Sequence, residues 1–214
     1  MKTADSVKNG YRRKIFLAVK RAFDLLAAFT GSILSIPIVL IACLAIMAEE
    51  PTASPFFIQE RVGKDGKHFF IYKLRSMHKN AEERLPELGE LNEAEGPAFK
   101  MKNDPRITKV GKVLRKTYID ELPQLWNVVK GDMSLVGPRP PLPREVEQYT
   151  DYQMQRLSVQ QGMTCYWQIA ENRYTFSFDK WVELDLKYVR EQSFRTDLTI
   201  LLSTIKTVLR AGGW

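Results

Sequence analysis

Two adjacent carboxylates, Asp120 and Glu121, stand just before Pro123, a residue that suits the first turn of a helix. A helix N-terminus presents unpaired N–H groups and the positive end of the helix dipole, so it keeps carboxylates ionised and attracts phosphate. Such a pair can supply an anionic nucleophile or a metal ligand. Taken alone, Asp120 is also consistent with an ordinary helix cap.

Cations in three parts of the chain could bind phosphate beside this pair. Arg139 lies between two prolines, which restrict its backbone, and its forked guanidinium suits phosphate oxygens. Lys73 and Arg75 leave a predicted strand and would share one of its faces. Arg115 lies five residues before the carboxylate pair. Each alone is usually a solvated charge, but together they favour a phosphate site.

Turn and capping signals predict the elements that would hold these residues. Two β-prone runs, 56–62 and 67–73, flank a Gly-rich turn and predict a β-hairpin. Capping residues predict short helices at 108–115 and 123–130. The acidic stretch 82–95 is expected to be an irregular, mobile loop. Further helices are expected at 145–156, 178–190 and 197–210, of which the last two are amphipathic. The apolar stripe of the last helix suits either a core or a membrane interface.

An apolar segment, 22–48, carries one charge, Asp24, at its edge. A membrane span needs roughly 20 apolar residues, so this segment is long enough to cross. It is also too long for a cleavable signal peptide. Pro37 removes one helical hydrogen bond and displaces the carbonyl of Ile33, which predicts a break in the helix. Hydroxyl groups near enough to bond the displaced carbonyl are those of Thr30, Ser32 and Ser35.

Basic residues flank the apolar segment on both sides, and basic flanks stay cytoplasmic. A spanning helix would break this rule on one side, whereas a helix that enters, breaks and leaves by the same face would not. We therefore expect a re-entrant segment. The flanking residues are Lys2, Lys8, Arg12, Arg13, Lys14, Lys20 and Arg21 before it, and Arg61, Lys64, Lys67, Lys73, Arg75 and Lys79 after it.

The chain of 214 residues carries a net charge of +7, which favours anionic partners such as phosphorylated small molecules and an anionic phospholipid membrane. Its two cysteines and two histidines have no metal-ligand spacing and form no disulfide framework. A zinc site is therefore not expected. The absence of a disulfide framework predicts that the protein works in a reducing compartment.

Across about residues 15–210 the chain resembles the bacterial sugar transferases, the monotopic polyprenyl-phosphate phosphoglycosyl transferases. It looks like a minimal catalytic form, because only about twenty residues precede the apolar segment. The family often has Ser-Pro at the membrane break, whereas here Ile36 precedes Pro37 and the serine is Ser35. The matching stretches are 20–24, 70–77, 104–108, 119–124, 127–140 and 185–189.

The resemblance implies a two-step transfer. Asp120 would attack the sugar-bearing phosphate of a nucleotide diphosphate sugar, with Glu121 as its partner, and a phosphosugar would form on the enzyme. The phosphosugar would then pass to undecaprenyl phosphate. Magnesium is expected, held by Asp120 and Glu121, because a divalent ion reduces the repulsion between the anions. Lys73, Arg115 and Arg139 match family positions near the phosphates, and Arg75 is a further candidate for substrate binding.

The same resemblance implies a UDP-sugar donor and the cytoplasmic face of the bacterial inner membrane. The step would be the first membrane step of exopolysaccharide, capsule, O-antigen or glycoprotein glycan assembly. Two departures bear on sugar choice: Gln160-Gln161 replaces a usual basic residue and proline, and Glu171-Asn172-Arg173 replaces Gly-Arg-Asn.

The expected fold is α+β, mainly α, with a re-entrant membrane helix-break-helix, a small β-hairpin and amphipathic interfacial helices. The expected domains are a basic N-terminal segment (1–21), the re-entrant helix broken at Pro37 (22–48) and a cytoplasmic catalytic domain (49–214).

Other functions remain open. A catalytically silent membrane scaffold of the same fold would be expected to have a broken carboxylate pair, whereas Asp120 and Glu121 are intact. A nucleic-acid-binding protein would not need the apolar segment, and no nucleic acid partner is expected. A conventional nucleotide-sugar glycosyltransferase would carry Asp-x-Asp, which Glu183-Leu184-Asp185 only approximates. The sequence leaves a homodimer open.

Overall fold

The computed structural model describes residues 4–93, 96–97, 99, 101 and 103–210. It is mainly helical, with one antiparallel and one parallel strand pair. The α-helices are α1 (Ala4–Glu49), α2 (Lys109–Thr117), α3 (Gln124–Lys130), α4 (Pro143–Val146), α5 (Asp151–Met154), α6 (Phe178–Glu191) and α7 (Phe194–Leu209). The strands are β1 (Phe56–Val62), β2 (His68–Leu74), β3 (Ser134–Val136) and β4 (Gly162–Thr164). Short 3-10 turns are η1 (Lys64–Gly66), η2 (Pro86–Leu91), η3 (Ile119–Glu121), η4 (Gln155–Ser158) and η5 (Arg173–Thr175).

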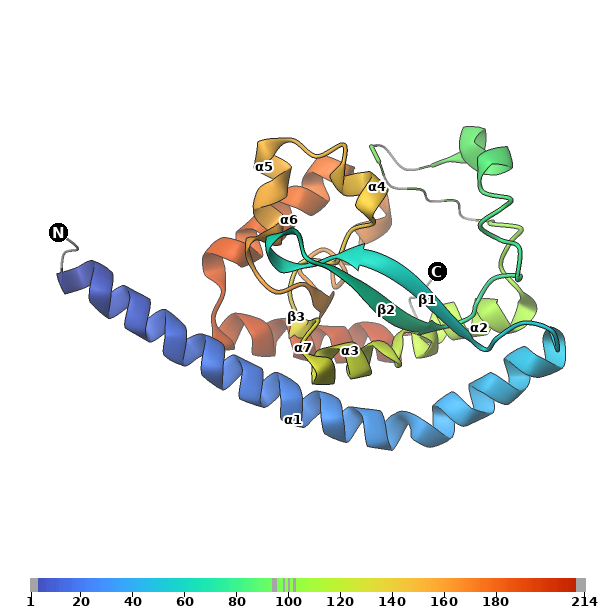
Figure 1. Cartoon of the computed structure of the whole chain (residues 1–214), viewed down its shortest axis with the longest axis horizontal. Coiled ribbons are helices and arrows are strands. Elements are labelled where there is room, and N and C mark those ends of the chain that lie inside the picture. Colours follow the sequence, from blue (N-terminus) through green and yellow to red (C-terminus); the bar gives the residue numbers. More distant parts are fainter. Residues whose placement is uncertain (1–3, 94–95, 98, 100, 102, 211–214) are drawn as a thin grey trace.

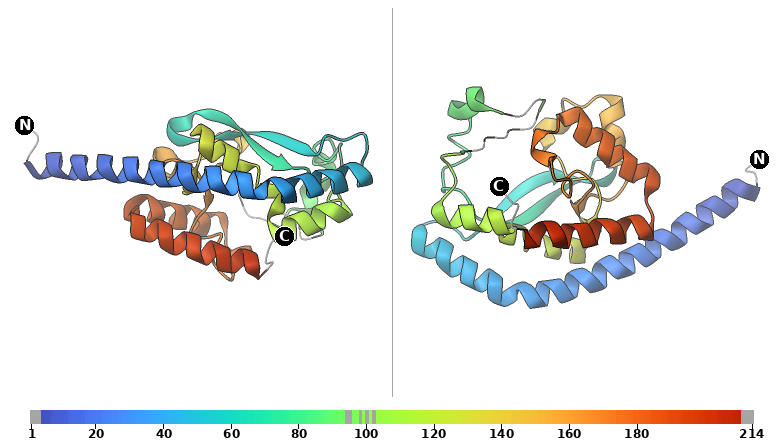
Figure 2. Two further views of the ribbon diagram at one scale, coloured as in Figure 1. Left: turned by 90° about the horizontal axis from the view of Figure 1, so that it is seen from below. Right: turned by 180° about the vertical axis from the view of Figure 1, so that it is seen from behind.

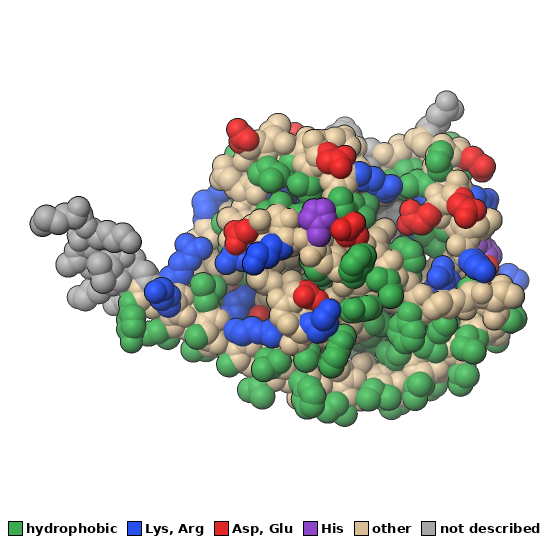
Figure 3. Space-filling view, viewed as in Figure 1, with side chains coloured by type: hydrophobic (Ala, Val, Ile, Leu, Met, Phe, Trp, Pro, Cys, Tyr) green, Lys and Arg blue, Asp and Glu red, His purple; other side chains and the backbone are tan. Residues whose placement is uncertain are grey.

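Helix α1 is long and curved, and the rest of the chain lies on its concave side (Figure 1). Residues Arg13–Glu49 form a helix that is long and apolar enough to cross a membrane, and only 11% of its most apolar window is buried. A core helix of a soluble protein would be mostly buried. Hydrophobic side chains gather along the convex lower edge in Figure 3, where α1 runs, so this surface suits lipid.

The structure shows a bend in the helix in place of the break expected at Pro37. Helix α1 continues through Pro37, so the segment is one bent helix and not two helices separated by a break. The expected use of serine hydroxyls is also different. Ser35 Oγ donates to the carbonyl of Ser32, at 2.9 Å, and Ser32 Oγ donates to the carbonyl of Ala28, at 2.8 Å, so neither hydroxyl goes to Ile33.

Three polar residues fix the N-terminal half of α1 to the rest of the chain. Lys20 Nζ lies 2.6 Å from Asp197 Oδ2 on α7, and both side chains are buried. Arg21 donates to the carbonyls of Val128 and Val129 in the last turn of α3, where few intrahelical donors remain for such groups. The third residue, Asp24, accepts from Ser134 Oγ, at 2.7 Å, and from the N–H of Leu135.

The C-terminal end of α1 is fixed to the same body. The two carboxylate oxygens of Glu49 accept the N–H groups of Lys109 and Val110 at 2.8 and 2.9 Å, and so cap α2. Glu50 also bonds to His78. The apolar segment is therefore attached to one folded unit at both of its ends.

The expected hairpin is confirmed. Strands β1 and β2 pair antiparallel, with Phe57 opposite Lys73, around the turn Lys64–Gly66. Asn127 of α3 joins the helix to β2, because its side-chain oxygen accepts the N–H of Tyr72 and its amide nitrogen donates to the carbonyl of Phe70. This fully buried amide fixes α3 against the strand that carries Lys73.

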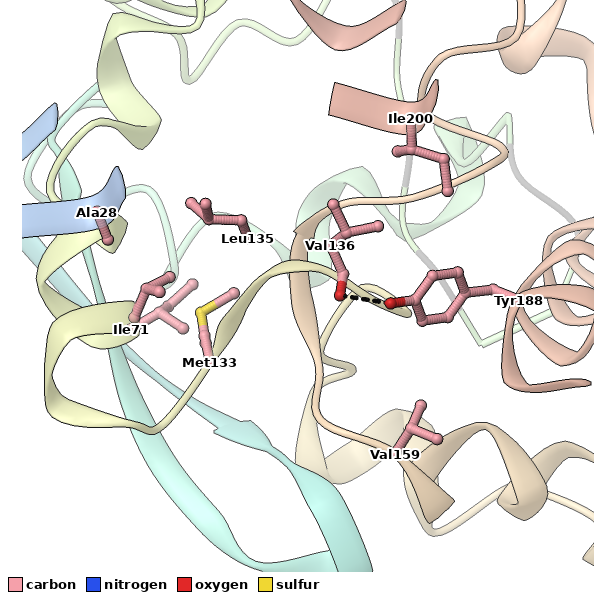
Figure 4. Close-up of a cluster of buried hydrophobic side chains, with 9 residues drawn as sticks. Ala28, Ile71, Met133, Leu135, Val136, Val159, Tyr188 and Ile200 are labelled. Atoms are coloured by element: carbon pink, nitrogen blue, oxygen red, sulfur yellow. Dashed lines mark hydrogen bonds between the residues drawn. The ribbon is translucent and has the colours of Figure 1, made fainter. Parts of the chain in front are cut away.

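Strands β3 and β4 are short, parallel and buried. Gly137 follows β3 and Gly162 is the first residue of β4, and the two glycines are in close contact: a Cβ at Gly162 would lie 2.0 Å from the backbone nitrogen of Gly137. Only glycine permits this approach. The main core surrounds these strands, and Figure 4 shows Tyr188 donating its hydroxyl to the carbonyl of Val136, at 3.0 Å.

The C-terminal half differs in detail from the sequence prediction. The single helix expected at 145–156 is divided into α4 and α5, because the Thr150 side chain accepts the N–H of Gln153 and starts a new helix. Helix α7 begins at Phe194, three residues earlier than expected, with Ser193 as its cap. The stretch 82–95 includes the 3-10 helix Pro86–Leu91; residues 94–95 lie outside the described part. Helix α7 runs beside α1 (Figure 2), and Phe194 packs edge-on against Phe23.

Candidate active site

Asp120 and Glu121 lie in η3, a single 3-10 turn between α2 and α3. Tyr118 ends α2 in the left-handed conformation, with φ 60°, which turns the chain sharply before the pair. A left-handed tyrosine is uncommon and mildly strained. The pair therefore belongs to a tight connection held by a helix on each side, close to the position expected just before the Pro123 helix.

Glu121 is held by two cations at one oxygen. Lys73 Nζ lies 2.7 Å from Glu121 Oε1, and Arg139 Nη1 lies 3.5 Å from the same atom. Burial alone would raise the pKa of Glu121, but the two cations together lower it to about 2. Glu121 is therefore ionised and engaged, and a carboxylate in that state is a weak nucleophile.

Asp120 has different surroundings. It is only 7% exposed, and no described cation lies within the 4.0 Å of an ion pair with it. Burial raises the pKa of Asp120, and Lys73 opposes that rise only in part. A buried carboxylate with a raised pKa is the more basic and more nucleophilic member of the pair.

The expected cations Lys73, Arg115 and Arg139 come together around the pair. Lys73 projects from β2, and burial lowers its pKa while Glu121 opposes that change. On α2, Arg115 is oriented by Ser76, whose hydroxyl accepts from Arg115 Nε at 2.9 Å. Burial lowers the pKa of Arg115, and the charge of Asp120 opposes that change.

Arg75 lies just beyond the strand that carries Lys73, and it has a different partner. Strand β2 ends at Leu74, and the Arg75 guanidinium turns to the carbonyl of Ser54, which accepts from Nε at 2.6 Å. Arg75 still lines the same cavity, without an ion pair to either carboxylate.

The carboxylate pair opens into a cavity of about 480 Å³. Its lining includes nine Lys or Arg residues and five Asp or Glu residues, a balance that suits an anionic ligand. The membrane residues Ser35 and Pro37 are not part of this lining. The lining cations are Arg61, Lys73, Arg75, Lys79, Arg106, Arg115, Arg139, Arg144 and Arg173.

Arg61 is a site residue that the sequence prediction placed only in the basic flank. It donates to the carbonyl of Pro140, at 2.9 Å, and to Gln59 Oε1, at 2.6 Å, and so supports the loop that carries Arg139. Burial and the nearby Arg139 lower the pKa of Arg61 to about 10, so it stays charged at neutral pH. Its value as a support depends on a contact across 79 positions of the chain, which no local pattern reveals.

Magnesium fits the donor atoms of this cavity only with help from a substrate. Within the described residues, no group of three or more His, Cys, Asp or Glu side chains could hold a metal. Magnesium is usually bound by one or two carboxylates together with substrate phosphates and water. Asp120 and Glu121 match that pattern, with Glu121 offering the oxygen that its cations leave free.

A family model described as bacterial sugar transferase matches residues 15–211. The chain with this fold and site therefore belongs to the bacterial sugar transferase family, and the match covers nearly its whole length. The expectation drawn from the sequence motifs is confirmed at the level of the family.

Relatives with curated names agree with this assignment. The galactosyl transferase CpsE of Streptococcus agalactiae is 43% identical over 199 residues, which cover 92% of this chain and 43% of that protein. The undecaprenyl-phosphate galactose phosphotransferase of Salmonella typhimurium is 40% identical over 211 residues, covering 97% of this chain and 44% of that protein. The exopolysaccharide production protein ExoY of Rhizobium meliloti is 37% identical over 210 residues, which cover 96% of this chain and 92% of that protein. This chain therefore spans less than half of the first two relatives and most of the third.

Proposed function

We propose that this protein transfers a sugar 1-phosphate from a nucleotide diphosphate sugar to a polyprenyl phosphate, with Asp120 as the nucleophile. The observation that supports this proposal most strongly is that the two carboxylates have different charged surroundings. Glu121 is ionised and paired with Lys73 and Arg139, whereas Asp120 is buried and forms no ion pair with any residue that the structure describes, in a cavity lined with cations.

In the first step, a carboxylate oxygen of Asp120 attacks the phosphorus that carries the sugar. A new P–O bond forms to Asp120 as the P–O bond to the nucleoside monophosphate breaks, and that monophosphate leaves with the bonding electrons. In the second step, an oxygen of the polyprenyl phosphate attacks the same phosphorus. The bond to Asp120 breaks, which restores the carboxylate and gives a polyprenyl diphosphate sugar.

The cations have separate tasks in these steps. Arg139 and Arg115 bind phosphate oxygens, and the forked guanidinium of Arg139 holds them in a fixed orientation. Lys73 keeps Glu121 ionised and reduces the repulsion between the carboxylate pair and the incoming diphosphate. A bound magnesium ion, held by Asp120 and Glu121, would supply further charge neutralisation on the phosphate oxygens.

A re-entrant membrane segment on the cytoplasmic face fits the same proposal. Buried or capping hydrogen bonds attach both ends of α1, at Lys20 to Asp24 and at Glu49, to one folded unit. If this helix crossed the bilayer, the folded unit attached at both of its ends would have to extend through the hydrocarbon core, roughly 30 Å thick, where its charged groups would be costly. The attachments therefore favour entry and exit at one face, where a nucleotide sugar is available.

Undecaprenyl phosphate and a UDP-sugar are the proposed substrates, and UDP-galactose is the donor to test first. Relatives of this chain are named for undecaprenyl phosphate and for galactose, including a UDP-galactose-lipid carrier transferase of Erwinia amylovora that is 41% identical over 211 residues. Polysaccharide assembly at the bacterial inner membrane is the proposed setting.

The test is release of nucleoside monophosphate by the purified full chain in membrane nanodiscs. A panel of UDP-sugars is supplied with magnesium, with or without undecaprenyl phosphate. The proposal expects sustained UMP release only with undecaprenyl phosphate, and loss of turnover in Asp120→Asn, which keeps the shape and removes the anion. A chain that binds undecaprenyl phosphate and shows no UMP release with any nucleotide sugar would instead be a catalytically silent scaffold.

A further inference from the structure

The loop that carries Arg139 is held by residues from distant parts of the chain. It covers residues 137–142, between β3 and α4. At its start, the carbonyl of Val136 accepts from the hydroxyl of Tyr188 at 3.0 Å. Further along, the carbonyl of Pro138 accepts the N–H of Gly162 at 2.9 Å. The backbone on the N-terminal side of Arg139 is therefore fixed by contacts outside the loop.

Arg139 itself is held at its carbonyl by Arg156, a residue of η4. Arg156 Nη2 donates to this carbonyl, at 3.4 Å. Arg156 is only 4% exposed, and it is not among the residues that line the active-site cavity. It therefore cannot bind a ligand in that cavity, and any effect it has on the reaction must pass through the residues that it contacts.

A buried carboxylate fixes Arg156. The same Nη2 atom donates to Asp185 Oδ2, and Asp185 is fully buried on α6. Burial raises the pKa of Asp185 to about 6, and the charge of Arg156 opposes that rise, so Asp185 is mostly ionised at neutral pH. The hydroxyl of Tyr149 accepts from Nη1 of Arg156 at 2.9 Å. Both terminal nitrogens of Arg156 thus have partners, which leaves its side chain little freedom to move.

The task of Arg139 makes its backbone position important. Arg139 Nη1 lies 3.5 Å from Glu121 Oε1, next to the catalytic carboxylate Asp120. Bidentate binding of phosphate requires the plane of a guanidinium to be oriented, whereas attraction to a point charge does not. A small shift of the backbone at Arg139 would leave its charge near the carboxylates and misalign its fork.

We infer that Arg156 is a positioning residue for Arg139, and that the buried Asp185 holds Arg156 in place for this task. The inference rests on the proposed function, because it takes Arg139 to bind the phosphate oxygens of the donor. The alternative is a pair that only stabilises the fold. A buried ion pair is weak evidence of that, since apolar side chains of similar volume often replace one without loss of stability. The contact with the Arg139 carbonyl favours the positioning role.

The test is a double-mutant cycle in the full chain, with Arg156→Lys and Arg139→Lys made singly and together. Arg156→Lys keeps a cation for Asp185 and loses the Nη2 atom that reaches the Arg139 carbonyl. The kcat/KM for the nucleotide sugar, from UMP release in nanodiscs, should fall about tenfold in Arg156→Lys alone. When residue 139 is already lysine, the further loss should be less than about twofold, because no fork remains to be oriented.

Equal losses in the two backgrounds would overturn the inference, because a pair that only stabilises the fold lowers kcat/KM by the same factor in both. Arg190→Lys, at an exposed arginine of α6, is the matched control and should leave kcat/KM within about twofold of wild type.

A second variant separates positioning from stability. Arg156→Met combined with Asp185→Leu replaces the buried ion pair by apolar side chains, so the Tm should stay within about 3 °C of wild type. The contact with the Arg139 carbonyl is lost, so kcat/KM should still fall about tenfold. Wild-type kcat/KM in this variant would overturn the inference.

Binding of UDP gives a readout that does not depend on turnover, because UDP carries the phosphates but no sugar to transfer. Calorimetric titration with UDP and magnesium should show the same pattern in Kd, with a smaller effect of Arg156→Lys when Arg139→Lys is present. A wild type with this pattern that releases no UMP from any nucleotide sugar would refute the proposed reaction and leave the positioning of Arg139 standing. Equal effects on Kd in both backgrounds, with UMP release intact, would refute the inference alone.

Discussion

Asp120 and Glu121 are neighbours in the chain, yet their surroundings assign them different tasks. Two cations hold Glu121 at one oxygen, while burial acts on Asp120 with little opposition. The sequence predicted the pair and three of the cations around it. It could not predict which carboxylate those cations would hold, because Lys73 lies 48 positions away from Glu121.

Lys73 lowers the pKa of both carboxylates, which leads to a prediction about pH. Asp120 must be ionised to attack, so kcat/KM should fall as the pH falls through the pKa of Asp120. Removing the cation in Lys73→Met should raise that pKa, and the acid limb of the pH–rate profile should move to higher pH as overall activity falls. Lys180→Met, which removes an exposed lysine of α6, should leave the limb in place. An acid limb at unchanged or lower pH in Lys73→Met would contradict this assignment.

Arg139 differs from an ordinary basic residue in its geometry. Arg139→Lys keeps the charge and loses the fork, so turnover should fall by about tenfold or more, because lysine cannot make the bidentate contact with phosphate. Arg13→Lys, in the exposed basic part of α1, should be nearly neutral, since a lipid head group responds mainly to charge. Equal effects of the two substitutions on kcat/KM would mean that Arg139 is only a surface charge.

At the scale of elements, the local signals were sufficient where one turn or cap decides the structure. Gly63 and Gly66 predicted the hairpin, Thr108 predicted the start of α2, and Pro123 and Gly131 bounded α3. Arg75 shows the limit of such signals. Its guanidinium donates to the carbonyl of Ser54, which belongs to another segment, so no pattern within β2 predicts this partner.

Asn127 connects two elements of the site, and its loss should be costly. Asn127→Leu keeps the volume but leaves the Tyr72 N–H and the Phe70 carbonyl without their partner. The Tm in detergent should fall by about 5 °C or more, and activity should fall because Lys73 follows Tyr72. The control is Gln148→Leu, where an exposed amide donates to the carbonyl of Arg144, and its Tm should change by less than about 1 °C. A stable and fully active Asn127→Leu would show that α3 does not depend on this contact.

At the scale of the whole molecule, α1 is both the membrane element and one wall of the fold. Lys20 and Asp24 form a buried network with Asp197 and Ser134. The sequence marked this stretch as typical of the family but gave no reason for it. The reason is a set of contacts more than 100 positions apart, which only the folded chain brings together.

The attachment of α1 at both ends predicts its topology. Single cysteines at Lys14 and at Lys64, in a background with Cys43 and Cys165 replaced, should both resist an impermeant thiol reagent in intact cells. Both should react once the inner membrane is opened. Labelling of the Lys14 site from outside would indicate a spanning helix. Pro37→Leu restores a helical hydrogen bond and should shift the segment toward that spanning state.

The central claim is that Asp120 carries the phosphosugar between the two substrates. The most direct measurement is mass spectrometry of the wild-type chain after incubation with its nucleotide sugar and magnesium, without a lipid acceptor. We expect a mass increase of one phosphosugar on the peptide that contains Asp120. The adduct should disappear when undecaprenyl phosphate is added, and it should not form in Asp120→Asn. An adduct on Glu121, or full turnover by Asp120→Asn, would contradict the account.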